Sequence, residues 1–279
     1  MDLSIIIINY NTLSLTKQCI DSVFEKTHNI QFEVILVDNA STDGSREFFS
    51  NDNRIQYIYN ETNLGFGKAN NIGVEIATGR NIFFLNSDTL LINNAAKILS
   101  DYLDENATVG ACGGNLYDAN LNPGYSYSLY PPSILLDLNK LLHNVPGRII
   151  SKGSISFNNT QSVLNVSFIT GADLMVKRDI LNTIGGFNTA FFMYFEDAEL
   201  CYRIKKSGFY VASVPSAKII HLVSVSVKKA ENNKSKKKRE MFKESRALYH
   251  SLTNRCKMYM LFTTFLNSRF MEKLFFIKK

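Results

Sequence analysis

Residues 3–8 read Leu-Ser-Ile-Ile-Ile-Ile, and the polar residues Asn9-Tyr10-Asn11-Thr12 follow directly. The run is apolar almost without interruption and rich in β-branched side chains, which is typical of a strand buried on both faces. Such strands belong to sheets that carry helices on both sides. The polar residues that follow predict that the strand ends near Asn9.

The next 80 residues repeat this arrangement. Further strands are expected over 32–37, 55–59 and 81–85, with helices over 13–25, 45–50 and 68–77. A strand–helix alternation at these lengths predicts an α/β protein with a doubly wound, mostly parallel sheet.

After Asp88 the alternation becomes less regular. We expect helices over 93–103, 178–184 and 198–206, and strands over 109–117, 166–169, 174–177, 210–214 and 217–221 that complete a mixed sheet. The stretch 121–162 holds four of the five prolines and predicts a long loop, partly helical near 134–142.

Composition divides the chain into two parts. Its apolar and charged fractions, 45% and 20%, are ordinary for a globular protein. Residues 228–279 carry 15 basic and 4 acidic side chains, whereas residues 1–227 carry 16 and 21. We therefore expect a catalytic domain over 1–227 and a basic helical tail over 228–279. Four scattered cysteines without metal-ligand spacing, and no segment long enough to span a membrane, indicate a cytoplasmic protein with reduced thiols.

Polar groups follow several of the expected strands. Asn9–Asn11, Asp38 and Asn86–Asp88 each stand at a carboxyl end, where open α/β sheets bind ligands. A second acidic group, Glu196-Asp197, follows the aromatic run 191–195. Carboxylates in such places can hold a divalent cation or remove a proton from a hydroxyl. The two groups together suggest metal-assisted chemistry on a phosphorylated donor.

The most familiar function of a doubly wound sheet is not supported. A dinucleotide-binding domain needs Gly-x-Gly-x-x-Gly after its first strand, and that place reads Asn-Tyr-Asn-Thr-Leu-Ser here. Nucleic-acid binding is also disfavoured, because Lys234-Ser-Lys-Lys-Lys-Arg239 is one block of charge and is more typical of a solvated linker.

Six stretches in order, 4–11, 34–44, 63–73, 85–89, 170–173 and 191–201, resemble the motifs of family 2 glycosyltransferases. The chain is most similar to the bacterial rhamnosyltransferase-like branch, over about residues 3–225. This resemblance implies a GT-A fold, a nucleoside-diphosphate sugar donor and inversion at the anomeric carbon. The remaining alternatives are a nucleotidyltransferase and a non-catalytic sugar-nucleotide or glycan-binding module.

The resemblance also implies roles for individual residues in nucleotide binding. Asp38 resembles the family's base-reading aspartate, whose carboxylate accepts the imide proton of uracil or thymine, although a turn aspartate is an alternative. The other nucleotide-binding candidates are Tyr10, Asn11, Gly65, Asn70 and Ser87.

For metal and proton chemistry the resemblance points to other positions. Asn86-Ser87-Asp88 stands where the family has Asp-x-Asp, so Asp88 would bind Mn²⁺ or Mg²⁺, with His221 as a second ligand. Asp197 would be the catalytic base, while Glu196 and Asp173 would contact the acceptor. Asp173 could equally cap the helix near Arg178.

The donor sugar stays open between dTDP-rhamnose and a UDP-hexose, and the acceptor is expected to be a saccharide or lipid-linked saccharide of a surface polysaccharide. From Met241, apolar residues recur at helical spacing among Lys and Arg. This pattern predicts that the tail lies on an anionic membrane surface, at the inner face of the cytoplasmic membrane. The alternative is that the apolar stripe packs on the catalytic domain or on a second subunit of a homodimer.

Overall fold

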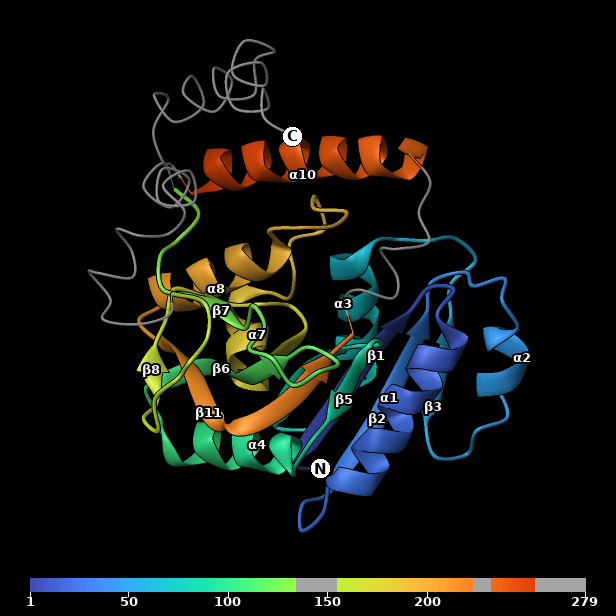
Figure 1. Ribbon diagram of the computed structural model, residues 1–279, viewed down its shortest axis with the longest axis horizontal. Helices are drawn as coiled ribbons and strands as arrows, with labels where there is room; N and C mark the ends of the chain where they lie inside the picture. Colours follow the sequence, from blue (N-terminus) through green and yellow to red (C-terminus); the bar gives the residue numbers. More distant parts are fainter. Residues whose placement is uncertain (134–154, 223–231, 254–279) are drawn as a thin grey trace.

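The computed structural model describes residues 1–133, 155–222 and 232–253. Figure 1 shows a twisted central sheet flanked by helices, with helix α10 (Asn232–Leu252) running above helix α8 (Glu196–Lys206). The architecture is the predicted α/β fold with a mostly parallel first half.

Four parallel strands form the first half of the sheet, in the order β3-β2-β1-β4. They are β1 (Leu3–Asn9), β2 (Phe32–Asp38), β3 (Gln56–Tyr59) and β4 (Asn81–Asn86). In register, Asn9 pairs with Asp38, and Ile8 pairs with Asn86. The carboxyl ends of these strands therefore meet at one edge, as the sequence predicts.

The isoleucine run of β1 is buried on both faces. Ile5 and Ile7 pack in one cluster with helices α1 (Leu13–Lys26) and α4 (Ala95–Glu105), and Ile6 packs in another with α3 (Phe66–Ile76), α7 (Arg178–Ile184) and α8. This explains why the strand is continuously apolar rather than alternating.

The second half of the sheet is mixed. Strand β10 (Asp173–Lys177) runs antiparallel between β4 and β6 (Val109–Tyr117), and β11 (Tyr210–His221) runs parallel to β6. A short strand, β5 (Thr89–Leu91), pairs antiparallel with the last residues of β11. This pairing places the end of β11 beside the residues that follow β4.

Several boundaries differ from prediction. The two strands predicted over 210–221 are one strand, β11, whose register with β6 shifts between Ser213 and Lys218, around Pro215. Within the strand predicted over 166–169 only Phe168–Ile169 is a strand, which pairs with 127–128, and a separate short strand just before it, 164–165, pairs with β11. These minor strands and the remaining helix are β7 (Tyr127–Ser128), β8 (Leu164–Asn165), β9 (Phe168–Ile169) and α2 (Ser45–Phe49). The helix predicted near 134–142 lies outside the described residues.

Residues 234–239 lie within helix α10, which agrees with the expected helical tail and not with the linker that this block of charge also suggested. Lys237, Lys238 and Arg239 are nonetheless exposed. Tyr249 is buried in the cluster that includes α8, so this part of the tail packs on the rest of the fold. The predicted boundary at residue 227 and the residues after Thr253 lie outside the described ranges. Within those ranges, no helix combines the length and apolarity needed to cross a membrane.

Candidate active site

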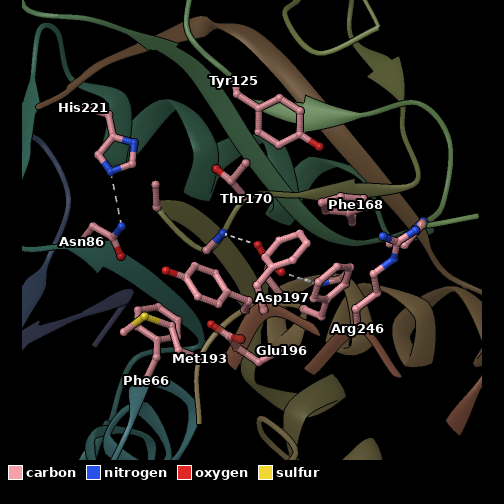
Figure 2. A pocket seen from close by; sticks show the side chains of 17 residues that line it. Phe66, Asn86, Tyr125, Phe168, Thr170, Met193, Glu196, Asp197, His221 and Arg246 are labelled. Carbon is pink, nitrogen blue, oxygen red and sulfur yellow. Dashed lines mark hydrogen bonds between the residues drawn. The ribbon is translucent and has the colours of Figure 1, made fainter. Parts of the chain in front are cut away.

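A cavity of about 590 Å³ opens beside the carboxyl end of β4 (Figure 2). Asn86 and His221 line one side, and Glu196 and Asp197 at the start of α8 lie at its floor with Gly171. Its walls are largely aromatic, with contributions from Phe66, Tyr125, Phe168, Tyr194, Phe195 and Phe242. The cavity therefore joins the strand ends to the second acidic group of the sequence.

The two candidate metal ligands lie together. His221 Nε2 is 3.2 Å from Asp88 Oδ1 and 3.4 Å from Asn86 Nδ2. The fold fixes this approach, because His221 pairs with Thr89 across β11 and β5, and the Leu222 N–H donates to the Asp88 carbonyl at 2.8 Å. Asp88 and His221, which are 133 positions apart in the sequence, thus lie in contact.

The chemistry of this pair suits a divalent cation. A carboxylate oxygen and an imidazole nitrogen are ligands that Mn²⁺ accepts, while Mg²⁺ prefers oxygen alone. Among the described residues, no three His, Cys, Asp or Glu side chains gather around one point, so an ion here would take further ligands from water or a diphosphate. Such a site is open to substrate.

Asp197 is held by two backbone N–H groups. Gly171 N donates to Asp197 Oδ2 at 2.9 Å, and Ala198 N donates to Oδ1 at 2.7 Å. Just before it, Tyr194 and Phe195 have φ values of 74° and 67°, a conformation that bulky residues rarely adopt. Burial raises the pKa of Asp197, and the backbone hydrogen bonds oppose this shift. The residue is therefore a fixed carboxylate with increased basicity.

Glu196 differs from its neighbour. Its side chain is 6% exposed, and its Oε2 atom has no hydrogen-bond partner among the described residues. Burial, together with the charge of Asp197, raises the pKa of Glu196 to about 8. Burial therefore favours the protonated form of Glu196, which lines the cavity beside Asp197.

The third acid of this group has a structural role. Glu199 forms a bidentate ion pair with Arg203, with nitrogen–oxygen distances of 2.8–3.0 Å. The remaining guanidinium hydrogens go to the carbonyl groups of Ile184, Gly185 and Gly186. Glu199 therefore orients Arg203, whose other hydrogen bonds tie α8 to the turn after α7, and Glu199 does not line the cavity.

Asp38 is fully buried at the end of β2. Its oxygens accept hydrogen bonds from Ser41 N at 2.8 Å, Tyr57 Oη at 3.0 Å and Asn9 Nδ2 at 3.2 Å. The carboxylate thus organises the loops after β1 and β2. These three donors use three of the roughly four acceptor positions of a carboxylate, so one position remains for a base, but Asp38 is buried and a neighbouring side chain would have to move to admit it.

The other nucleotide-binding candidates gather around the same edge. Tyr10 is half exposed, and Asn11 Oδ1 accepts a hydrogen bond from Thr42 N at 2.7 Å. Ser87 Oγ lies 3.2 Å from Thr12 Oγ1, next to the metal-ligand pair.

Two candidates in 65–70 have partners within the protein. Gly65 has a φ of 82°, and a Cβ there would lie 2.4 Å from the Phe192 carbonyl oxygen, so its close approach is to this carbonyl. Asn70 is buried and donates from Nδ2 to the Phe66 carbonyl at 3.0 Å. Neither residue lines the cavity.

Asp173 is not where the sequence suggested. It is fully buried in β10, its Oδ2 accepts a hydrogen bond from Gly114 N at 2.7 Å, and burial raises its pKa well above the usual value. A side chain enclosed between strands cannot reach an acceptor hydroxyl, and it does not cap helix α7. Its contact with Gly114 instead joins β10 to β6.

Sequence reasoning missed Phe242 and Arg246, which reach the cavity from α10. The helical spacing from Met241 onward suggested an apolar stripe, but residues 242, 246 and 249 form the face that meets the domain. Their spacing of four and three was the available signal.

Comparisons with known proteins place these features in context. A sequence profile described as Glycosyl transferase family 2 matches residues 4–185, which is more than half of the chain. The chain is 25% identical over 238 residues to the low-salt glycan biosynthesis hexosyltransferase Agl10 of Haloferax volcanii, covering 79% of this chain and 67% of that protein. It is 26% identical over 205 residues to the N-acetylglucosaminyl-diphospho-decaprenol L-rhamnosyltransferase of Mycobacterium tuberculosis, covering 67% and 66%.

Coverage of other relatives is smaller. The chain spans 15% of an uncharacterized glycosyltransferase of Rickettsia bellii, at 38% identity over 106 residues, and 58% of the glycosyltransferase GlyG of Streptococcus pneumoniae.

Solved structures share the fold at low sequence identity. GalNAc-T7 with UDP, GalNAc and Mn²⁺ aligns with a TM-score of 0.60 at 15% identity, covering 80% of this chain and 44% of that one. The mannosyltransferase PcManGT of Pyrobaculum calidifontis, in complex with GDP-Man and Mn²⁺, aligns with a TM-score of 0.53 at 20% identity, covering 79% and 56%. The fold is thus GT-A, and with the profile match over residues 4–185 the chain belongs to glycosyl transferase family 2.

Proposed function

We propose that this protein is a metal-dependent inverting glycosyltransferase that moves a sugar from a nucleoside diphosphate to a hydroxyl of a saccharide acceptor. One observation carries the proposal: a single cavity has Asn86 and His221, the neighbours of Asp88, on one side and the Asp197 carboxylate at its floor. Diphosphate departure and proton removal both need such groups, on opposite sides of the reacting carbon.

On the donor side, Asp88 and His221 would hold Mn²⁺ or Mg²⁺, which neutralises charge on a departing diphosphate. The similar proteins GalNAc-T7 and PcManGT were crystallised with Mn²⁺, which supports this cofactor. Tyr10, Asn11 and Ser87 would contact the nucleotide, and Asp38 would accept the imide proton of a uracil or thymine base.

On the acceptor side, Asp197 would remove the hydroxyl proton as the oxygen attacks the anomeric carbon. Its two backbone hydrogen bonds fix its position, and its raised pKa makes it a better base. General base catalysis of this kind contributes roughly 10²–10⁴-fold to a rate. A single base and a direct displacement imply inversion of the anomeric configuration.

The relatives favour glycan or surface polysaccharide synthesis. The Mycobacterium tuberculosis relative, named as a rhamnosyltransferase, supports dTDP-rhamnose, and the hexosyltransferase Agl10 supports a nucleotide-linked hexose. A saccharide carried on a lipid would place the reaction at the cytoplasmic face of a membrane.

The test combines a donor panel with two substitutions. With Mn²⁺, the full chain should release UDP or dTDP from its donor in the presence of acceptor, and a chelator should stop release. Asp197→Asn should lower transfer by at least 10²-fold with donor affinity kept within a few-fold, because the base contacts the acceptor proton. Asp88→Ala should instead remove the Mn²⁺ dependence of nucleotide binding measured by calorimetry, with a smaller effect for His221→Ala.

Asp179→Asn, at an exposed acid on α7, is the matched control and should leave both measurements unchanged. Normal turnover in a folded Asp197→Asn protein would remove the base assignment. Nucleotide affinity that is equal with and without Mn²⁺ in the wild type would remove the metal assignment.

A further inference from the structure

Helix α10 contributes a positively charged side chain, Arg246, to the cavity. Phe242, Arg246 and Tyr249 are spaced by four and three residues, so they lie on one face of the helix. Phe242 packs against Phe195 with ring centroids 5.0 Å apart, and the Ser245 hydroxyl donates to the Met193 carbonyl at 2.7 Å. These contacts before Arg246, and the packing of Tyr249 on Phe195 after it, fix where Arg246 enters the cavity.

Arg246 differs in charge from the rest of the cavity wall. Among the described residues that line the cavity, it alone carries a permanent positive charge, and the other titratable groups with resolved shifts are acids or tyrosines. Figure 2 shows Arg246 on the far side of Asp197 from Asn86 and His221. The guanidinium therefore lies beyond the base, away from the candidate metal ligands.

We propose that Arg246 binds an anionic group of the acceptor, either a phosphate or diphosphate ester or a carboxylate. This inference rests on the proposed function, because the base defines which end of the cavity receives the acceptor. A guanidinium presents two parallel N–H groups that match the oxygens of phosphate and carboxylate equally well. The aromatic walls formed by Phe168, Phe195 and Phe242 suit the apolar faces of an attached sugar.

Further positive charge lies close to this part of the cavity. A second cavity of about 380 Å³ shares Ala198 with the first and is lined by Lys205, Lys206 and Tyr249. Lys205 already donates to the Val166 carbonyl at 2.8 Å, but its charge remains beside the cavity. Positive charge therefore also lines this second cavity, where an anionic group would be tolerated better than a cationic one.

The test measures binding by the full chain, with UDP and Mn²⁺ present so that the donor side is filled. The probes are octyl diphosphate, octyl glucuronide and neutral octyl glucoside. At least one anionic probe should bind the wild type, with its Kd raised 10-fold or more in Arg246→Gln and less in Arg246→Lys. Lys243→Gln, at an exposed position one turn away on α10, should leave every Kd within twofold. Octyl glucoside should not distinguish the variants.

Arg246 dependence of octyl diphosphate alone would identify the anion as a phosphate ester, and dependence of octyl glucuronide alone would identify a carboxylate. Equal Kd values in wild type and Arg246→Gln for both, or no binding of either anion at millimolar concentration, would overturn the inference. So would loss of UDP binding in Arg246→Gln, because Arg246 would then serve the donor. Absence of both UDP and dTDP binding in the wild type would instead count against the proposed function, whatever the anionic probes do.

Discussion

Glu196 and Asp197 are neighbours in the chain but titrate differently. Asp197 accepts two backbone hydrogen bonds that stabilise its charge, whereas Glu196 Oε2 is buried without a partner among the described residues. The backbone hydrogen bonds thus stabilise the charged form of Asp197, and Glu196 has no such support. Asp197 should therefore ionise at the lower pH of the two, so Glu196→Gln should not move the acid limb of the activity profile.

Glu196 also makes stability depend on pH. Its pKa of about 8 in the folded protein lies above its ordinary value of 4.5, so the unfolded chain releases this proton first. The stabilisation from a protonated Glu196 is therefore complete below pH 4.5 and is lost as the pH rises to about 8. Relative to wild type, Glu196→Gln should gain stability across this window, reaching a few kcal/mol at about pH 8.

Urea unfolding at several pH values measures this difference. Glu105→Gln, at an exposed acid on α4, should give a curve parallel to that of the wild type. A Glu196→Gln curve that is also parallel to wild type would mean that Glu196 ionises normally in the folded protein.

At the scale of elements, the sequence predicts best where burial is regular. Strands β1, β2 and β4 are buried on both faces, so their apolar runs and polar ends could be read directly. Strand β5 has three residues and exists because β11 pairs with it, so no local pattern marks it. The candidate site residues differ in the same way. Asp88, His221 and Asp197 lie at the ends of strands or at the start of a helix, so local sequence patterns mark them. Arg246 reaches the cavity only because α10 packs on other helices, and no local pattern marks that packing.

The packing of α10 on the rest of the fold can be tested by substitution. Tyr249 is buried and its ring centroid lies 5.8 Å from that of Phe195. Tyr249→Ala should lower the free energy of unfolding by about 3 kcal/mol, the cost of removing a buried aromatic side chain. Leu252→Ala, on the same helix but 44% exposed, should cost less than about 1 kcal/mol.

Denaturant unfolding of the Tyr249→Ala and Leu252→Ala variants measures the two losses in the free energy of unfolding. Equal and small losses would indicate that α10 is detached from the domain in solution. That result would also remove the structural basis for a cavity wall formed by Phe242 and Arg246.

At the scale of the whole molecule, charge and apolar surface are unevenly distributed. The excess of basic side chains lies after residue 227, and part of it is exposed on α10 at Lys237, Lys238 and Arg239. Leu248 and Tyr249 of α10 pack on the rest of the fold, and the large apolar residues left exposed on the helix, Phe242 and Leu252, are too few to hold it on a lipid surface. Membrane attachment would therefore depend on residues 254–279, which carry six basic and one acidic side chain among many apolar ones.

Binding to vesicles tests the role of residues 254–279. The full chain should co-sediment with phosphatidylserine-containing vesicles at low salt and much less with neutral vesicles, since each basic residue near an anionic surface contributes about 1 kcal/mol. A chain ending at Thr253 keeps the exposed basic residues of α10 but lacks the apolar segment, and should lose most of this binding. Added salt should weaken attachment of the full chain, because the attraction is screened within about 10 Å at 0.1 M. Equal binding of the two chains would assign the attraction to α10 alone, and no binding of either would remove the membrane surface as a partner.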